Sequence, residues 1–136
     1  MVSPSSGDNA RLLASFLDYL KVEKGLAPLS IAAYGHDLEQ FAEFLTKLAG
    51  TQDGAGTLLD HSMLMYGSNM SNSDRHDNYP EPNIVVGGGA GRMKLGGQHI
   101  VLPERTPIAN LHLTLLQKVG VERDKFGDST GTIAGV

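Results

Sequence analysis

Residues 30–50 read SIAAYGHDLEQFAEFLTKLAG, and this stretch has the clearest periodicity of the chain. Apolar side chains recur along it at steps of three or four, at Ile31, Tyr34, Leu38, Phe41, Leu45 and Leu48. The spacing predicts an amphipathic helix with one apolar stripe, on which Tyr34 belongs to the core. Ser30 is placed to cap its start and Gly50 to close its end. Gly35 inside the helix costs roughly 1 kcal/mol relative to alanine, which packing of the stripe has to offset.

A shorter helix is predicted upstream of this one. Its apolar positions also follow helical spacing, at Leu12, Leu13, Phe16, Leu17 and Leu20. Gly25 fits the left-handed position that ends a helix, and Ala27-Pro28-Leu29 forms a short connection to the cap of the next. So short a connection favours an antiparallel helical hairpin.

The chain changes character near residue 50. Of its 17 glycines, only Gly7, Gly25 and Gly35 precede that point. We therefore predict two domains, residues 1–49 and residues 50–136. Residues 62–66, 83–86 and 98–102 are short apolar runs typical of strands, and polar loops followed by a helix indicate part of an α/β sheet. The predicted class is α+β: a helical hairpin followed by a small α/β segment of short strands and one helix.

That late helix has a clear start signal in Thr106-Pro107, a cap residue followed by proline at the first helical position. Gly120 is expected to end it. Its predicted apolar face is made of Ile108, Leu111, Leu115, Leu116 and Val119. The glycine run of residues 87–91 follows a strand but matches neither the dinucleotide nor the Walker-type pattern, so we predict a tight turn with positive φ.

Composition excludes several classes of function. The chain has no cysteine, which rules out disulfides, thiolate zinc sites and cysteine nucleophiles. The net charge is −4, and neither half has the basic excess that non-specific nucleic-acid binding favours. Neither a signal peptide nor a membrane-spanning run is visible, so a cytoplasmic protein without a membrane partner is expected.

The first half also resembles a known family. The matching residues are Phe16 to Leu20, Glu23-Lys24-Gly25-Leu26, Ser30, Ala33-Tyr34, Asp37-Leu38, Phe41 and Phe44-Leu45. Over residues 11–46 this pattern is similar to the amino-terminal core-binding domain of Xer-type tyrosine recombinases. The resemblance implies a SAM-like helical module that clamps double-stranded DNA. Carried over by position, it implies DNA contacts at Lys24, Ser30, Tyr34 and His36.

The second half, over residues 47–133, resembles the carboxyl-terminal segment of the HXXSHH-motif family, whose function is unassigned. The resemblance rests on Gly56 to Ser62, Tyr66-Gly67-Ser68, Arg75-His76-Asp77, Gly87 to Gly91, Thr106 to Leu111 and Phe126 to Gly131. The layout of that family is distantly similar to alkaline phosphatases and sulfatases. By that analogy His76, with Asp74 or Asp77, would bind a divalent metal; a solvated turn is the competing interpretation.

Three functions follow as alternatives. The leading one is a DNA-binding module of the tyrosine recombinase type, linked to DNA integration and recombination, whose catalytic domain a partner would supply in trans. The second is the remnant of a metal-dependent, phosphatase-like hydrolase. The third is a fusion of two gene fragments without a joint function. Because the catalytic residues of both families are missing, we expect no enzymatic activity and no obligatory cofactor.

Overall fold

The computed structural model describes residues 14–19, 21–22, 27–67, 76, 78–79, 81–93 and 97–136. The chain divides into two compact units, Met1–Lys47 and Leu48–Val136, and each is treated separately below. The regular elements among the described residues are helices and short antiparallel strands, which confirms the predicted α+β class. None of the described helices is both long enough and apolar enough to cross a lipid bilayer.

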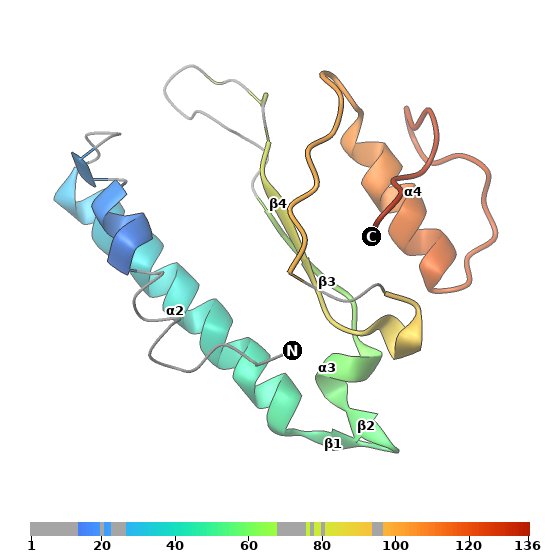
Figure 1. The fold of residues 1–136 in the computed structure, drawn as a ribbon, viewed down its shortest axis with the longest axis horizontal. Coiled ribbons are helices and arrows are strands. Elements are labelled where there is room, and N and C mark those ends of the chain that lie inside the picture. Colours follow the sequence, from blue (N-terminus) through green and yellow to red (C-terminus); the bar gives the residue numbers. More distant parts are fainter. Residues whose placement is uncertain are drawn as a thin grey trace. The chain divides into compact units, whose positions relative to one another are not determined.

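Unit 1 is helical. Residues 14–19 and 21–22 are in helical conformation, and the long helix α2 spans Pro28–Gly50, its last three residues lying in unit 2 (Figure 1). The two helical segments approach each other at Gly35, the one buried residue of α2. A Cβ atom added there would lie 3.4 Å from Cδ1 of Leu17, an ordinary van der Waals distance, so the first helix packs next to the α2 backbone at this point. This contact confirms the predicted helical hairpin.

The start of α2 differs from the prediction. The helix begins at Pro28, and the Ile31 amide donates to the Ala27 carbonyl at 3.1 Å. Ser30 therefore lies inside the first turn and does not cap the helix. Proline explains the shift, because its fixed φ suits the first helical position and its missing N–H has no partner there to lose. Gly50 ends the helix as predicted.

The apolar stripe of α2 is only partly covered. Tyr34 is 48% exposed, so its predicted place in the core is wrong. The other five stripe residues are half-buried. The physical reason is length: α2 makes roughly six turns, whereas the described helical residues upstream make two to three and pack near Gly35.

The described residues of unit 2 form two separate two-stranded sheets. β1 (Gln52–Asp53) pairs with β2 (Gly56–Thr57), and β3 (Leu64–Gly67) pairs with β4 (Asn83–Val86). Both pairs are antiparallel. β1 and β2 are joined by two residues, a connection that antiparallel strands allow and parallel strands do not. The strand predicted at 83–86 is confirmed, and the one predicted at 62–66 begins two residues later.

The glycine run after β4 packs on the backbone of the short helix α3 (Leu58–His61). The Gly88 amide donates to the Leu59 carbonyl and the Gly89 amide to the Ser62 carbonyl, both at 3.0 Å. A Cβ atom on Gly87 or Gly88 would collide with backbone oxygens of this segment. Gly87 and Gly89 have φ values of 113° and 54°, and the 3-10 turn η1 (Gly89–Gly91) follows, which confirms the tight turn.

Helix α4 (Ile108–Lys118) carries the core of unit 2. It ends in a Schellman motif, in which Gly120 has a φ of 88° and the Val121 amide donates to the Leu116 carbonyl at 3.0 Å. Its start is confirmed within one residue. Thr106 does not cap it, however, because its hydroxyl donates to the Pro103 carbonyl at 2.7 Å.

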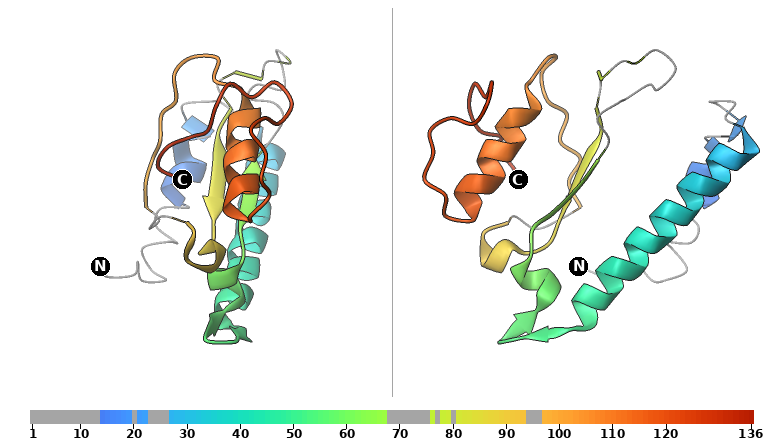
Figure 2. Two further views of the ribbon diagram at one scale, coloured as in Figure 1. Left: turned by 90° about the vertical axis from the view of Figure 1, so that its right-hand side faces the viewer. Right: turned by 180° about the vertical axis from the view of Figure 1, so that it is seen from behind.

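The buried face of α4 is not the predicted one. Its buried residues are Ala109, Asn110, Leu111, Leu113 and Thr114. Of the predicted face only Leu111 is buried; Ile108 and Val119 are exposed. The carboxyl-terminal tail explains the difference, since it runs back along α4 and covers this side of the helix (Figure 2).

Polar bonds fix the tail to α4. Asn110 accepts a hydrogen bond from the Thr130 amide, and the Thr114 hydroxyl accepts one from the Ile133 amide, both at 2.8 Å. The hydroxyl of Thr114 donates in turn to the Asn110 carbonyl at 2.7 Å. The tail is therefore attached by specific bonds as well as by apolar contact.

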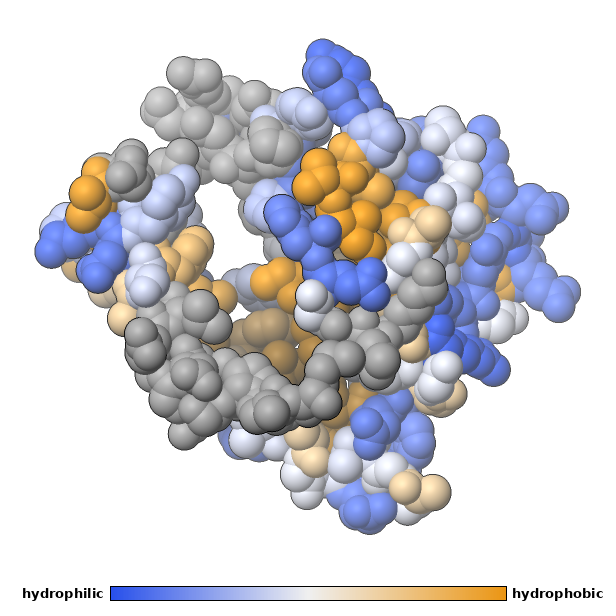
Figure 3. Space-filling view, in the orientation of Figure 1, coloured by the Kyte–Doolittle hydropathy of each residue, from blue (hydrophilic) through white to orange (hydrophobic). Residues whose placement is uncertain are grey.

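The segment predicted as a third strand, residues 98–102, has no strand conformation. Ile100 packs instead against the tail, where a Cβ atom on Gly135 would lie 3.1 Å from its Cδ1 atom. Ile100, Val101 and Leu102 remain exposed, and Figure 3 shows orange, apolar surface over unit 2. The core of unit 2 is correspondingly small.

Candidate functional site

The residues predicted to contact DNA lie on two faces of α2. Ser30 and Tyr34 are one turn apart on one face, and both are exposed. His36, two residues beyond Tyr34, lies roughly 200° around the helix axis from it. Lys24 lies outside the described residues. The structure thus brings Ser30 and Tyr34 together and separates His36 from them.

His36 belongs to an open groove in unit 1. The groove has a volume of about 650 Å³ and runs along the side of α2 that carries Gly35. It is lined by Leu17, Lys21, Pro28, Ile31, Ala32, Gly35, His36 and Glu39. The His36 ring is exposed, and its Nε2 lies 2.6 Å from Nε2 of Gln40, one turn further along. This bond turns the imidazole toward its own helix.

The face of Ser30 and Tyr34 begins at the amino terminus of α2. The first turn of the helix contains no acidic residue. Helix amino termini carry unpaired amide N–H groups and a partial positive charge. The Ser30 hydroxyl therefore lies at the end of α2 where a phosphate oxygen would be best accommodated.

The predicted metal ligands are not assembled in the described part of the chain. His76 is exposed and has a φ of 53°. Asp74 and Asp77 lie outside the described residues. Among the residues that the structure does describe, no three histidine or carboxylate side chains are grouped as a metal site would need.

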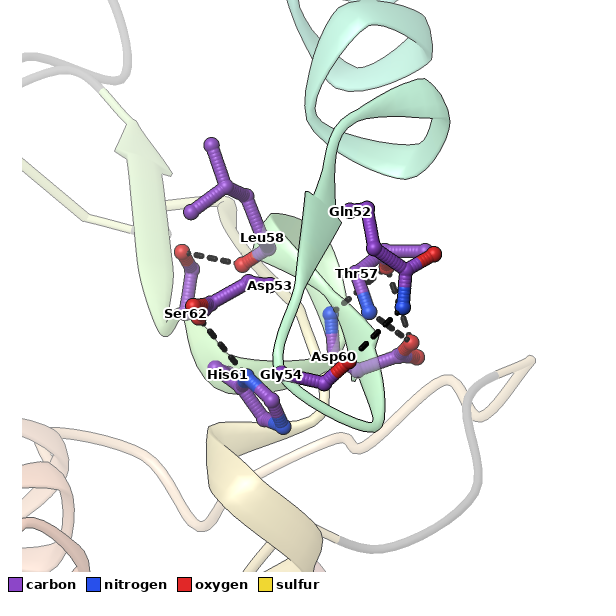
Figure 4. Close-up of polar contacts among 8 residues, drawn as sticks. All are labelled: Gln52, Asp53, Gly54, Thr57, Leu58, Asp60, His61 and Ser62. Atoms are coloured by element: carbon purple, nitrogen blue, oxygen red, sulfur yellow. Dashed lines mark hydrogen bonds and ion pairs between the residues drawn. The ribbon is translucent and has the colours of Figure 1, made fainter.

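Sequence analysis missed a polar network at the β1–β2 hairpin (Figure 4). His61 Nδ1 lies 2.8 Å from the Asp53 carboxylate, and the short α3 is capped reciprocally by Thr57 and Asp60. Hydrogen bonds from the Thr57 hydroxyl and the Thr57 amide, both at 2.8 Å, lower the pKa of Asp60 below its ordinary value. The sequence signal was Gly54, since glycine is favoured at the first position of a two-residue hairpin loop and has a φ of 56° here.

The same hairpin orients the His61 ring. Because its Nδ1 faces a carboxylate, that nitrogen carries the hydrogen and Nε2 is the acceptor in the neutral ring. Ser62 does not extend the pair into a catalytic triad, since its hydroxyl donates to the Leu58 carbonyl at 2.6 Å. The network therefore stabilises the hairpin and α3, and it places one histidine beside the glycine turn.

Comparison with known protein families identifies a match for the first part of the chain. Residues 13–57 match the family model of the phage integrase, N-terminal SAM-like domain. The match covers α2 and the β1–β2 hairpin, 45 of the 136 residues, and it confirms the resemblance of the first half to the integrases. No solved structure matches the chain. The resemblance of residues 47–133 to the HXXSHH-motif family stays a prediction.

Proposed function

We propose that residues 13–57 form a DNA-binding module of the tyrosine recombinase type, which takes part in DNA integration or recombination without catalysing it. The observation that supports this most directly is the match to the integrase N-terminal SAM-like domain. The packed helical hairpin of unit 1 agrees with such a module. Strand cleavage would need a recombinase catalytic domain supplied by a partner in trans.

Within the module, we propose the face of Ser30 and Tyr34 as the DNA contact. The amino terminus of α2 offers backbone amides and a hydroxyl to a phosphate, with no acidic side chain in the first turn to repel it. The half-exposed ring of Tyr34 lies one turn along and supplies flat apolar surface and a phenol hydroxyl. His36 points away from this face and is not part of the proposed contact.

The charge of the chain sets the expected strength of binding. Residues 1–50 contain four basic and six acidic side chains, so no extended basic surface is available. Binding then rests on a few local phosphate contacts rather than on a broad electrostatic attraction. Because amides and a hydroxyl release few counterions, raising salt from 50 to 200 mM should weaken affinity measurably but less than about 10-fold.

The test is fluorescence anisotropy of a labelled DNA duplex with the full chain across this salt range. Ser30→Glu places a negative charge at the proposed contact while suiting the positive end of the helix dipole, so the helix should stay intact. We expect it to weaken binding at least about fivefold. Val101→Glu adds the same charge at a position of unit 2 that is 80% exposed and serves as the matched control.

Two results would refute the proposal. One is the absence of duplex binding at 50 mM salt, or binding that does not change with salt. The other is an equal loss of affinity in Ser30→Glu and Val101→Glu, which would mean that only net charge matters. Circular dichroism of each variant should match the wild type, so that lost binding cannot be assigned to a lost helix.

A further inference from the structure

A small cleft of about 170 Å³ lies in unit 2, where the glycine turn meets the carboxyl-terminal end of α4. Its lining includes three basic residues, His61, Arg92 and Lys118, together with the apolar Val119. Figure 1 shows the turn η1 near this end of α4. The cleft lies outside the segment that matches the integrase domain.

Arg92 and Lys118 are held to each other's backbone. Arg92 Nη1 donates to the Lys118 carbonyl at 2.9 Å, and Lys118 Nζ donates to the Arg92 carbonyl at 2.6 Å. The residues are 26 positions apart in sequence, so these bonds attach the glycine turn to α4. A guanidinium has five N–H donors and an ammonium three, so each group keeps most of its donors for another acceptor.

Among the described residues, no carboxylate pairs with either of these two cations. In the described part of the chain, the ion pairs are Asp53 with His61 and Glu104 with Arg105. Asp53 balances the charge of His61 when that ring is protonated. The carboxyl-terminal dipole of α4 offsets about half a unit charge, which leaves Arg92 and Lys118 together clearly positive.

We propose that this cleft binds a small tetrahedral oxyanion, as inorganic phosphate or as the phosphate group of a small monoester. Two fixed cations with spare donors match the several acceptor oxygens of such an anion. The volume of about 170 Å³ is sufficient for an anion of this size. The residues of the cleft all belong to unit 2, so phosphate binding can be tested independently of DNA binding.

The experiment is a titration of the full chain with sodium phosphate, followed by ¹H–¹⁵N NMR at constant ionic strength. We expect saturable shifts confined to the amides of residues 89–92 and 118–121, with a Kd of about 1 mM or tighter. Methyl phosphate distinguishes the two possible ligands. If it binds as well as inorganic phosphate, the cleft accepts the phosphate group of a monoester; if only inorganic phosphate binds, the ligand is the free ion. Acetate, which is planar, should bind more weakly than either.

Lys118→Gln removes one cation and should weaken phosphate binding about threefold to tenfold. Arg105→Gln removes a cation that is 88% exposed elsewhere and should leave it unchanged. Val119→Glu places a carboxylate in the cleft without touching the bonds of Arg92 and Lys118, so it should abolish binding in a folded protein. The proposal is overturned if phosphate shifts no more than chloride does, if acetate binds equally well, or if Val119→Glu binds phosphate like the wild type.

Discussion

The bond between Thr114 and the tail offers the sharpest test of how unit 2 is held together. Thr114 is buried on α4, and its hydroxyl is the acceptor for the Ile133 amide at 2.8 Å. Thr114→Val keeps the shape of the side chain and removes that acceptor. The Ile133 amide, on a residue only 9% exposed, is then left unpaired.

The magnitude follows from three contributions. An unpaired buried donor costs about 1–3 kcal/mol. The lost bond to the Asn110 carbonyl costs little, because that carbonyl lies inside α4 and has a helical partner. The added methyl of valine returns up to about 0.8 kcal/mol. The net loss should be about 1–2 kcal/mol, which corresponds to an opening of the tail that is roughly 5- to 30-fold more frequent.

Amide hydrogen exchange measures this opening locally, so it does not require the two units to unfold together. In Thr114→Val the Ile133 amide should exchange faster by that factor. Thr114→Ser, which keeps the hydroxyl and loses one methyl, should protect Ile133 better than valine does. Wild-type protection of Ile133 in Thr114→Val, or poorer protection in the serine variant than in the valine variant, would refute the role of the hydroxyl.

Three further predictions concern other contacts. Gly88→Ala should destabilise unit 2 by about 1–3 kcal/mol in urea unfolding. The φ of −85° at Gly88 suits alanine, so the loss would come from the new Cβ, which would strike the backbone of Asp60. Gly131→Ala is the control, because there is open space around Gly131, and equal destabilisation by the two variants would contradict close packing at Gly88. Gly35→Ala should raise the stability of the helical hairpin by up to about 1 kcal/mol in thermal unfolding, because alanine favours the helix and its Cβ would make only an ordinary contact with Leu17. A loss of stability would mean that the helices have to move apart to admit the methyl group. The pKa of Asp60 is lower in the folded protein than in the unfolded chain, where it is near 3.9. Its carboxylate therefore stabilises the cap of α3 at any pH above that value, and this stabilisation is lost as the pH falls through the folded pKa. A ¹³C titration should show a higher Asp60 pKa in Thr57→Val, and an unchanged pKa would refute the assignment to Thr57.

Local signals located the helices well. The periodicity of residues 31–48 and Gly50 predicted α2 and its end, and Gly120 marked the end of α4. The signal at α4 works because Gly120 supplies the left-handed backbone conformation that this helix end requires. The starts were less certain. Pro28 is the first residue of α2 and Pro107 occupies the cap position of α4, so the expected cap residues Ser30 and Thr106 do not cap these helices.

Long-range packing could not be predicted from the same patterns. The buried face of α4 is chosen by the tail, which lies about 20 residues further along the chain, through Asn110 and Thr114. A hydropathy pattern counts these residues as polar and so places the face on the other side of the helix. For the same reason residues 98–102 suggested a strand, although Ile100 packs on the tail rather than on a neighbouring strand.

For the candidate sites, too, local sequence signals found some residues, whereas their arrangement in space could not be predicted. Family likeness selected Ser30, Tyr34 and His36, but only a helix built from Pro28 shows that the first two share a face and the third does not. The pair of Arg92 and Lys118 could not be found from sequence, because 26 residues separate them and neither belongs to a motif. Their proximity depends on the glycine turn, whose close approach to α3 only the folded backbone reveals.

The acidic balance of unit 1 bears directly on how DNA binding should be judged. A module with a broad basic surface would bind any polyanion and show a steep salt dependence. This chain has more acidic than basic side chains before residue 50, so such binding is not expected of it. What remains is a local contact at the start of α2, where backbone amides and the Ser30 hydroxyl replace lysines. A shallow salt dependence combined with a large effect of Ser30→Glu is the pattern that a local contact produces and a basic surface does not.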